Sequence, residues 1–189
     1  MRKALTATAL LLAAAALPAA TPAAAAPVGQ QPPQVLVHSA RFAPPMALIP
    51  SDAVTYDMEL VPAGAYIAVA QMSAGRASVV RLAVDGLLPD RRYGAHVHTR
   101  PCGALPQDSG PHYQRVPDPV QPSVDPAYAN PANEVWLDFT TNAAGRAAAL
   151  AAHGWRLRAG EARSIVIHEE GTADGETSRR VGCFTVPLR

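Results

Sequence analysis

The chain has 189 residues, and its charge is nearly balanced, with 16 Lys and Arg against 15 Asp and Glu and a formal net charge of +1. Two of the positive charges, Arg2 and Lys3, lie in an N-terminal segment that we expect to be removed. The mature chain then carries no basic field that would recruit nucleic acid, and its length suits one domain with a hydrophobic core.

The N-terminus has the three parts of a secretory signal peptide. Arg2 and Lys3 are followed by an apolar run over 4–17 and by a small-residue stretch that ends at 24–26. A membrane anchor is the alternative, but the apolar run is shorter than the roughly 20 residues that span a bilayer. We therefore expect residues 1–26 to be a signal peptide and the mature protein to be secreted or held in the cell envelope, without membrane contact after cleavage.

Residues 27–50 are rich in proline, alanine and glutamine, and we expect a flexible arm whose one candidate element is a short strand at 35–38. From residue 51 to 189 the chain alternates short β-type runs with turn residues. This pattern predicts an all-β domain, a Greek-key β-sandwich or barrel of about eight antiparallel strands, immunoglobulin-like in architecture. The expected strands cover 54–59, 65–71, 77–84, 92–98, 135–141, 164–168 and 181–186.

Two segments depart from this rhythm. Residues 100–133 are rich in proline and show no periodicity, which predicts a long loop, and long loops in compact domains are usually functional or disordered. A cysteine at its start and a histidine inside it favour a functional, tethered loop. The alanine-rich residues 143–153 fit a short helix or a turn followed by one strand, and the sequence leaves both open.

The histidines form the most informative pattern. His96 and His98 are two residues apart in an expected strand, so their side chains point to the same face and can share a metal ion. His112 lies in the long loop, and His168 ends the apolar run Ile165-Val-Ile-His168. Each histidine alone has an ordinary explanation. It could lie on the surface, be solvated in a loop, or be buried in the core with its hydrogen bonds made. Together they favour one site, and imidazoles without a thiolate suit copper or zinc.

The two cysteines, Cys102 and Cys183, lie beside the histidine segments. In the oxidising compartment that export implies, we expect them to form a disulfide. The bridge would close a loop of about 80 residues and tether the long loop, which is worth roughly 4–5 kcal/mol on the chain-entropy model.

These segments resemble the copper/zinc superoxide dismutase family over about residues 65–187. The turn Val84-Asp-Gly-Leu-Leu-Pro is similar to the one that precedes the family's first histidine strand. The ligand segments of the family are matched by Gly94-Ala-His-Val-His98, by Gly110-Pro-His112 and by Val166-Ile-His168, and its arginine-to-cysteine segment by Arg180-Val-Gly-Cys183.

The resemblance implies a copper site made by His96, His98, His112 and His168. It also implies that Arg180 guides superoxide, with a surface salt bridge to Glu169 or Glu170 as the alternative role, and that His112 handles a proton. The expected function is a secreted superoxide dismutase that converts superoxide to oxygen and hydrogen peroxide. A non-catalytic exported copper-binding protein with the same fold is the alternative, and a metal-free β-sandwich is a third possibility. The pattern predicts no oligomeric state.

The sequence departs from the family where zinc would bind. No histidine occurs between His112 and His153, and carboxylates alone are a poor set of zinc ligands. The segment from His168 to Arg180 is short, and Thr172 stands where the family has an aspartate that links the two metal sites. We therefore expect copper without zinc, as in the copper-only branch of the family.

Overall fold

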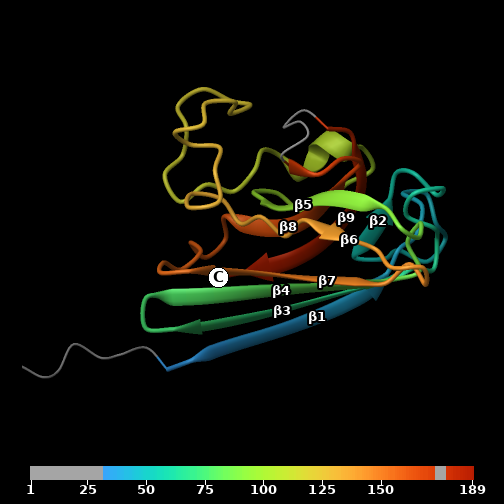
Figure 1. The fold of residues 1–189 in the computed structure, drawn as a ribbon, viewed down its shortest axis with the longest axis horizontal. Helices are drawn as coiled ribbons and strands as arrows, with labels where there is room; N and C mark the ends of the chain where they lie inside the picture. The colour runs from blue at the N-terminus through green and yellow to red at the C-terminus, as the bar shows by residue number, and fades with distance from the viewer. Residues whose placement is uncertain (1–31, 173–177) are drawn as a thin grey trace, which may run out of the picture. The chain divides into compact units, whose positions relative to one another are not determined.

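The computed structural model describes residues 32–172 and 178–189, and the expected signal peptide lies outside these residues. The described residues belong to one compact unit, Gln31–Arg189, that contains two antiparallel sheets (Figure 1). The first sheet has the strand order β1-β3-β4-β7. Its strands are β1 (Gln34–Arg41), β3 (Tyr66–Ala74), β4 (Ala77–Asp85) and β7 (Ala147–His153).

The second sheet has the order β2-β9-β8-β5-β6. Its strands are β2 (Ala53–Thr55), β9 (Arg180–Leu188), β8 (Ala162–His168), β5 (Arg92–His98) and β6 (Phe139–Thr140). After β5 and β6 the chain crosses to β7 in the first sheet and then returns as β8 to lie beside β5, which is a Greek-key connection. The expected all-β sandwich is confirmed.

One boundary needs correction. The segment expected to be a flexible arm with a short strand at 35–38 contains the longer strand β1, which pairs with β3 over its whole length from Gln34 to Arg41. Leu36 and Ala40 of this strand pack against the hydrophobic core, so the strand has a face to bury despite its proline- and glutamine-rich flanks. The β domain therefore begins before residue 51.

The ambiguous alanine-rich segment is a turn followed by a strand. Gly145 has a positive φ of 68° and its amide donates to Asn142 O, which closes the turn before β7. Ala147–His153 then pairs with β4. Two expected strands are shorter than predicted, because regular pairing is confined to Ala53–Thr55 and to Phe139–Thr140.

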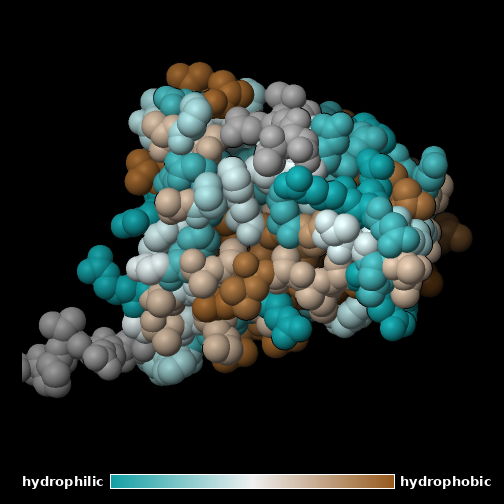
Figure 2. All heavy atoms as spheres, in the orientation of Figure 1, coloured by the Kyte–Doolittle hydropathy of each residue, from teal (hydrophilic) through white to brown (hydrophobic). Residues whose placement is uncertain are grey.

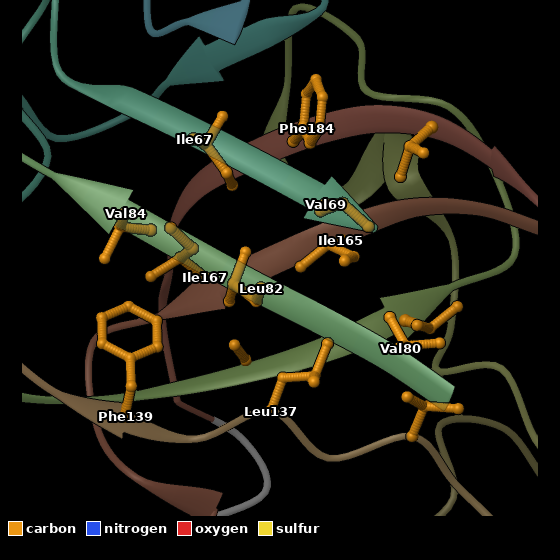
Figure 3. Packing of buried hydrophobic residues seen from close by; sticks show 14 of the residues in the cluster. Ile67, Val69, Val80, Leu82, Val84, Leu137, Phe139, Ile165, Ile167 and Phe184 are labelled. Atoms are coloured by element: carbon orange, nitrogen blue, oxygen red, sulfur yellow. The ribbon is translucent and has the colours of Figure 1, made fainter. Parts of the chain in front are cut away.

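The core lies between the two sheets (Figure 3). Alternate residues of each strand point inward, and the largest of them are almost fully buried. The first sheet contributes Ile67, Val69, Val80 and Leu82, and the second contributes Ile165, Ile167 and Phe184. Each such side chain stabilises the fold by roughly 1.5–3 kcal/mol.

The outer face of the first sheet carries few charges. Its side chains are mostly small or apolar, and Val35, Val37, Met72 and Leu150 are each at least 60 % exposed. Hydrophobic residues accordingly gather over the lower part of the molecule in Figure 2, where β1, β3, β4 and β7 lie in Figure 1. Arg81 stands in the middle of this face, in register with Ala70 on β3 and Leu150 on β7.

The long loop packs against the second sheet. The disulfide between Cys102 and Cys183 ties it to β9, as expected. A short 3₁₀ helix, η1 (Pro106–Ser109), follows, and a single antiparallel bridge then pairs His112 with His98 on β5. Within the described part of the chain, no helix has the length and apolar character to cross a membrane.

Candidate metal centre

Two paired strands supply three of the four histidines. His96 and His98 alternate on β5, and His168 ends the neighbouring strand β8, in register with Gly94. All three imidazoles are buried, with exposures of 2 %, 0 % and 3 %. Gly94 leaves room there, because a Cβ at this position would lie 2.5 Å from Glu170 O and 3.4 Å from the Cβ of His168.

The loop brings the fourth histidine to the same place. The Tyr113 amide donates to Val97 O at 2.8 Å and the Thr99 amide to Pro111 O at 3.1 Å, so His112 is fixed against β5. The candidate ligand atoms of the four histidines all lie within 4.8 Å of one another. The residues expected from sequence are therefore brought together.

Each imidazole has one nitrogen held by the protein. Nδ1 of His98 donates to Gly110 O at 2.9 Å and Nδ1 of His168 donates to Ser178 O at 3.0 Å, and their two Nε2 atoms are 3.4 Å apart. These carbonyl acceptors fix the tautomer, so Nε2 has a lone pair directed at the centre.

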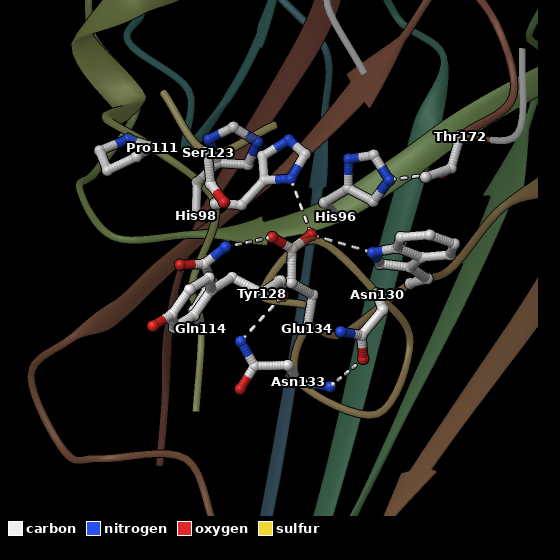
Figure 4. A network of polar contacts seen from close by, with 12 residues as sticks. His96, His98, Pro111, Gln114, Ser123, Tyr128, Asn130, Asn133, Glu134 and Thr172 are labelled. Carbon is white, nitrogen blue, oxygen red and sulfur yellow. Dashed lines mark hydrogen bonds and ion pairs between the residues drawn. The ribbon is translucent and has the colours of Figure 1, made fainter. Parts of the chain in front are cut away.

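His96 has the opposite orientation. Its Nε2 is hydrogen-bonded to Thr172 Oγ1 (Figure 4), and its buried Nδ1 has no hydrogen-bond partner among residues 32–172 and 178–189. A buried polar nitrogen without a partner is costly, and a metal ion would satisfy it. The centre therefore offers the Nδ1 of His96 and the Nε2 of the other three histidines.

The buried imidazoles are neutral near pH 7. Burial, together with the nearby His112, holds the pKa values of His96 and His98 well below 6.5. Burial also lowers the pKa of His168, to about 4. Neutral imidazole is the form that binds a metal, so these three histidines can accept a cation without first losing protons.

Glu134 completes the surroundings of His112. Its carboxylate accepts from His112 Nδ1 at 2.9 Å, from Trp136 Nε1 at 2.9 Å and from Gln114 Nε2 at 2.8 Å (Figure 4). Burial acts to raise the pKa of Glu134, but these hydrogen bonds outweigh it and lower the pKa below its ordinary value. The ionised carboxylate thus holds the His112 ring with Nε2 toward the centre.

Asp138 acts on His96 through a hydroxyl group. Thr172 Oγ1 and its amide both donate to the Asp138 carboxylate, the amide at 2.7 Å, while the same Oγ1 accepts from His96 Nε2. The family resemblance puts Thr172 where the family has an aspartate, and it assigns no role to Glu134 or Asp138. Their contacts to the histidines depend on loop geometry, and no spacing in the sequence indicates them.

A pocket of about 170 Å³ opens beside the histidines and is lined by His112, His168, Glu134, Arg180 and loop residues 121–123. Arg180 Nη1 donates to Pro106 O at 3.1 Å and to Ser109 Oγ at 3.0 Å. Glu169 pairs with Arg179 instead, at 2.9 Å. The salt bridge with Glu169, which was the alternative role for Arg180, is thus made by Arg179. The guanidinium group of Arg180 is half-buried at the wall of the pocket.

Comparisons with known proteins add little beyond the fold. No protein-family model and no curated protein matches the chain. Among 29 matching chains of solved structures is the crystal structure of a double mutant of a SOD-like protein from Bacillus subtilis. It is 15 % identical, covers 72 % of this chain and 97 % of that chain, and has a TM-score of 0.48. The four-histidine group and the disulfide, however, fit the copper/zinc superoxide dismutase family.

Proposed function

We propose that this protein is a secreted superoxide dismutase that uses copper without zinc. The observation that carries the proposal is the arrangement of four buried or half-buried imidazoles, each with one nitrogen held by the protein and the other directed at a common centre. The arginine at the wall of the adjoining pocket gives the centre a place for a small anion.

The donor set fits copper. Four imidazole nitrogens suit Cu and Zn among common metals, and a cation at this point would satisfy the Nδ1 of His96, which has no hydrogen-bond partner among the described residues. The other nitrogen of His112 is bonded to the Glu134 carboxylate, which fills the position where a second metal would otherwise use that imidazole. This contact supports a single-metal site.

Bound copper would supply a one-electron couple that oxidises one superoxide to oxygen and reduces a second, with two protons, to hydrogen peroxide. Arg180 supplies the fixed positive charge for the anion. At 4 Å a pair of unit charges near a protein surface attracts by about 4 kcal/mol before desolvation is counted. His112 is the most solvent-accessible of the four histidines, so its Nε2, when not bound to the metal, would be placed to take a proton from water.

Export is part of the proposal. The disulfide between Cys102 and Cys183 is consistent with an oxidising compartment. The N-terminal sequence has the charge, apolar run and small residues of a signal peptide.

The test is reconstitution of the disulfide-intact protein with copper alone, followed by measurement of bound metal and superoxide turnover. We expect one copper per chain and fast turnover. Arg180→Gln should retain copper but slow turnover and weaken its dependence on salt, because the anion loses its partner. Arg179→Gln is the matched control, since Arg179 pairs with Asp57 and Glu169 and does not line the pocket.

The alternative outcomes are distinct. One bound copper without turnover would make the protein a copper-binding protein and overturn the enzymatic assignment. No bound copper would overturn the metal site itself. Equal effects of the two arginine substitutions would remove the guiding role of Arg180 but leave the metal site in place.

A further inference from the structure

A second hollow, of about 370 Å³, lies elsewhere on the molecule and shares no lining residue with the histidine pocket. It is lined by Trp155, by two glycines and by four arginines, namely Arg76, Arg115, Arg156 and Arg158. Among the residues that the structure describes, none of those lining it carries a carboxylate. We name it the arginine pocket.

Three distant segments build this pocket. Arg76 lies in the turn between β3 and β4, Arg115 in the long loop, and the other two arginines in the connection after β7. The adjoining glycines face open space, because a Cβ added at Gly75 or Gly154 would meet nothing within 4 Å. The fold thus gathers guanidinium groups around a space that its own side chains leave open.

One arginine forms a rigid wall. Arg158 donates to the backbone oxygens of Arg115 at 2.7 Å and Gln114 at 2.9 Å, and its guanidinium lies 4.8 Å from the centroid of the Tyr113 ring. Its Nε forms an ion pair with Glu161 Oε2 at 2.6 Å. Arg158 therefore has a structural role and joins the long loop to the connection between β7 and β8.

The bottom of the pocket is also fixed. The Trp155 indole is 8 % exposed and donates to Ala132 O at 3.1 Å, while Trp155 O accepts from Ser78 Oγ at 2.8 Å. His153 stacks on the indole with 4.2 Å between ring centroids. A site with a fixed base needs to order only the side chains at its rim when a ligand binds.

The rim carries the uncompensated charge. Arg76 and Arg115 are exposed, and within residues 32–172 and 178–189 neither makes an ion pair with a carboxylate. Arginines that line one hollow repel one another where no acid compensates their charge, as at Arg76 and Arg115, and a bound anion reduces that repulsion. Their planar donors also match the oxygens of phosphate and sulfate in pairs.

We infer that the arginine pocket binds sulfate or phosphate groups, supplied either as a free anion or by an anionic polymer outside the cell. Arg76 and Arg115 hold the anion, and Arg158 and Trp155 keep the pocket in shape. This site is separate from the proposed copper centre and does not depend on it.

Calorimetric titration of the copper-loaded protein with inorganic sulfate and with dextran sulfate, at low salt, tests the inference. We expect saturable binding, and the doubly substituted variant Arg76→Gln, Arg115→Gln should raise Kd about tenfold or more, because charge-assisted hydrogen bonds are lost. Arg146→Gln is the matched control. Arg146 precedes β7 at the end opposite Gly154 and pairs with Asp85 instead.

Saturation by inorganic sulfate would identify a site for a free anion, and saturation by dextran sulfate alone would identify a polymer site. Both results support the inference when they depend on Arg76 and Arg115. Absence of binding to either probe, an undiminished affinity of the double variant, or an equal loss in the Arg146→Gln control would overturn it. Superoxide turnover should be the same in all three proteins, so failure here is distinguishable from failure of the proposed function.

Discussion

Removal of the disulfide should affect both stability and the position of Arg180. Cys102 and Cys183 are 81 residues apart in sequence. On the chain-entropy model, a closed loop of this length stabilises the fold by about 4.5 kcal/mol. The bridge also anchors the segment that leads to η1, where Pro106 and Ser109 accept hydrogen bonds from Arg180. The double variant Cys102→Ala, Cys183→Ala should therefore lose about 4 kcal/mol of unfolding free energy.

Urea unfolding of the metal-free proteins measures this loss without a contribution from bound copper. Superoxide turnover of the copper-loaded variant should also fall and become less sensitive to salt, because Arg180 loses its fixed position. Other contacts hold the same segment, among them the hydrogen bonds from the Cys102 amide to Thr185 Oγ1 at 3.0 Å and from Ser164 Oγ to Arg100 O at 2.7 Å. A loss below about 1 kcal/mol would show that these contacts suffice, and it would refute the assignment of the stability to the bridge.

Two further substitutions test the metal centre. Glu134→Gln replaces the anionic acceptor of His112 Nδ1 with a neutral amide, so copper affinity in a chelator competition should fall about 10- to 100-fold. Glu161→Gln, at a carboxylate that pairs with Arg158 and does not contact the histidines, should leave the copper affinity unchanged. Gly94→Ala places a Cβ 2.5 Å from a backbone oxygen and should cost about 1–3 kcal/mol in urea unfolding. In Gly154→Ala the Cβ meets nothing within 4 Å, so a similar cost there would contradict the steric explanation.

Much of the fold can be predicted from the sequence because apolar and polar residues alternate along its strands. The strand Arg92–His98 was predicted with its observed limits, and β4, β8 and β9 differ from their predictions by a few residues at the ends. For β1 the sequence indicated only a short strand at 35–38, because Gln34, Ser39 and Arg41 are polar, and the full strand is held by eight residues of pairing with β3. Backbone pairing with a distant strand leaves little trace in local sequence.

The candidate metal site also has a part that the sequence predicts and a part that it does not. His96 and His98 were predictable because an i, i+2 pair on a strand determines where two side chains point, whereas His112 and His168 were added by the joint histidine pattern and the family resemblance. The partners of those histidines were not predictable, since Glu134 reaches His112 across 22 residues of loop and Asp138 reaches His96 through Thr172. The ion pair of Arg179 with Glu169 is a further case, because only the register at the end of β8 decides which of two adjacent arginines makes it.

The apolar outer face of the first sheet has a consequence for how the protein behaves at high concentration. Two copies that stacked these faces would bury Arg81, which stands in the row of Ala70 and Leu150 with apolar side chains around it. Burying a guanidinium without a partner costs several kcal/mol, which counts against the gain from burying the apolar side chains around it. A single charge in the centre of the sheet thus opposes self-association through this face.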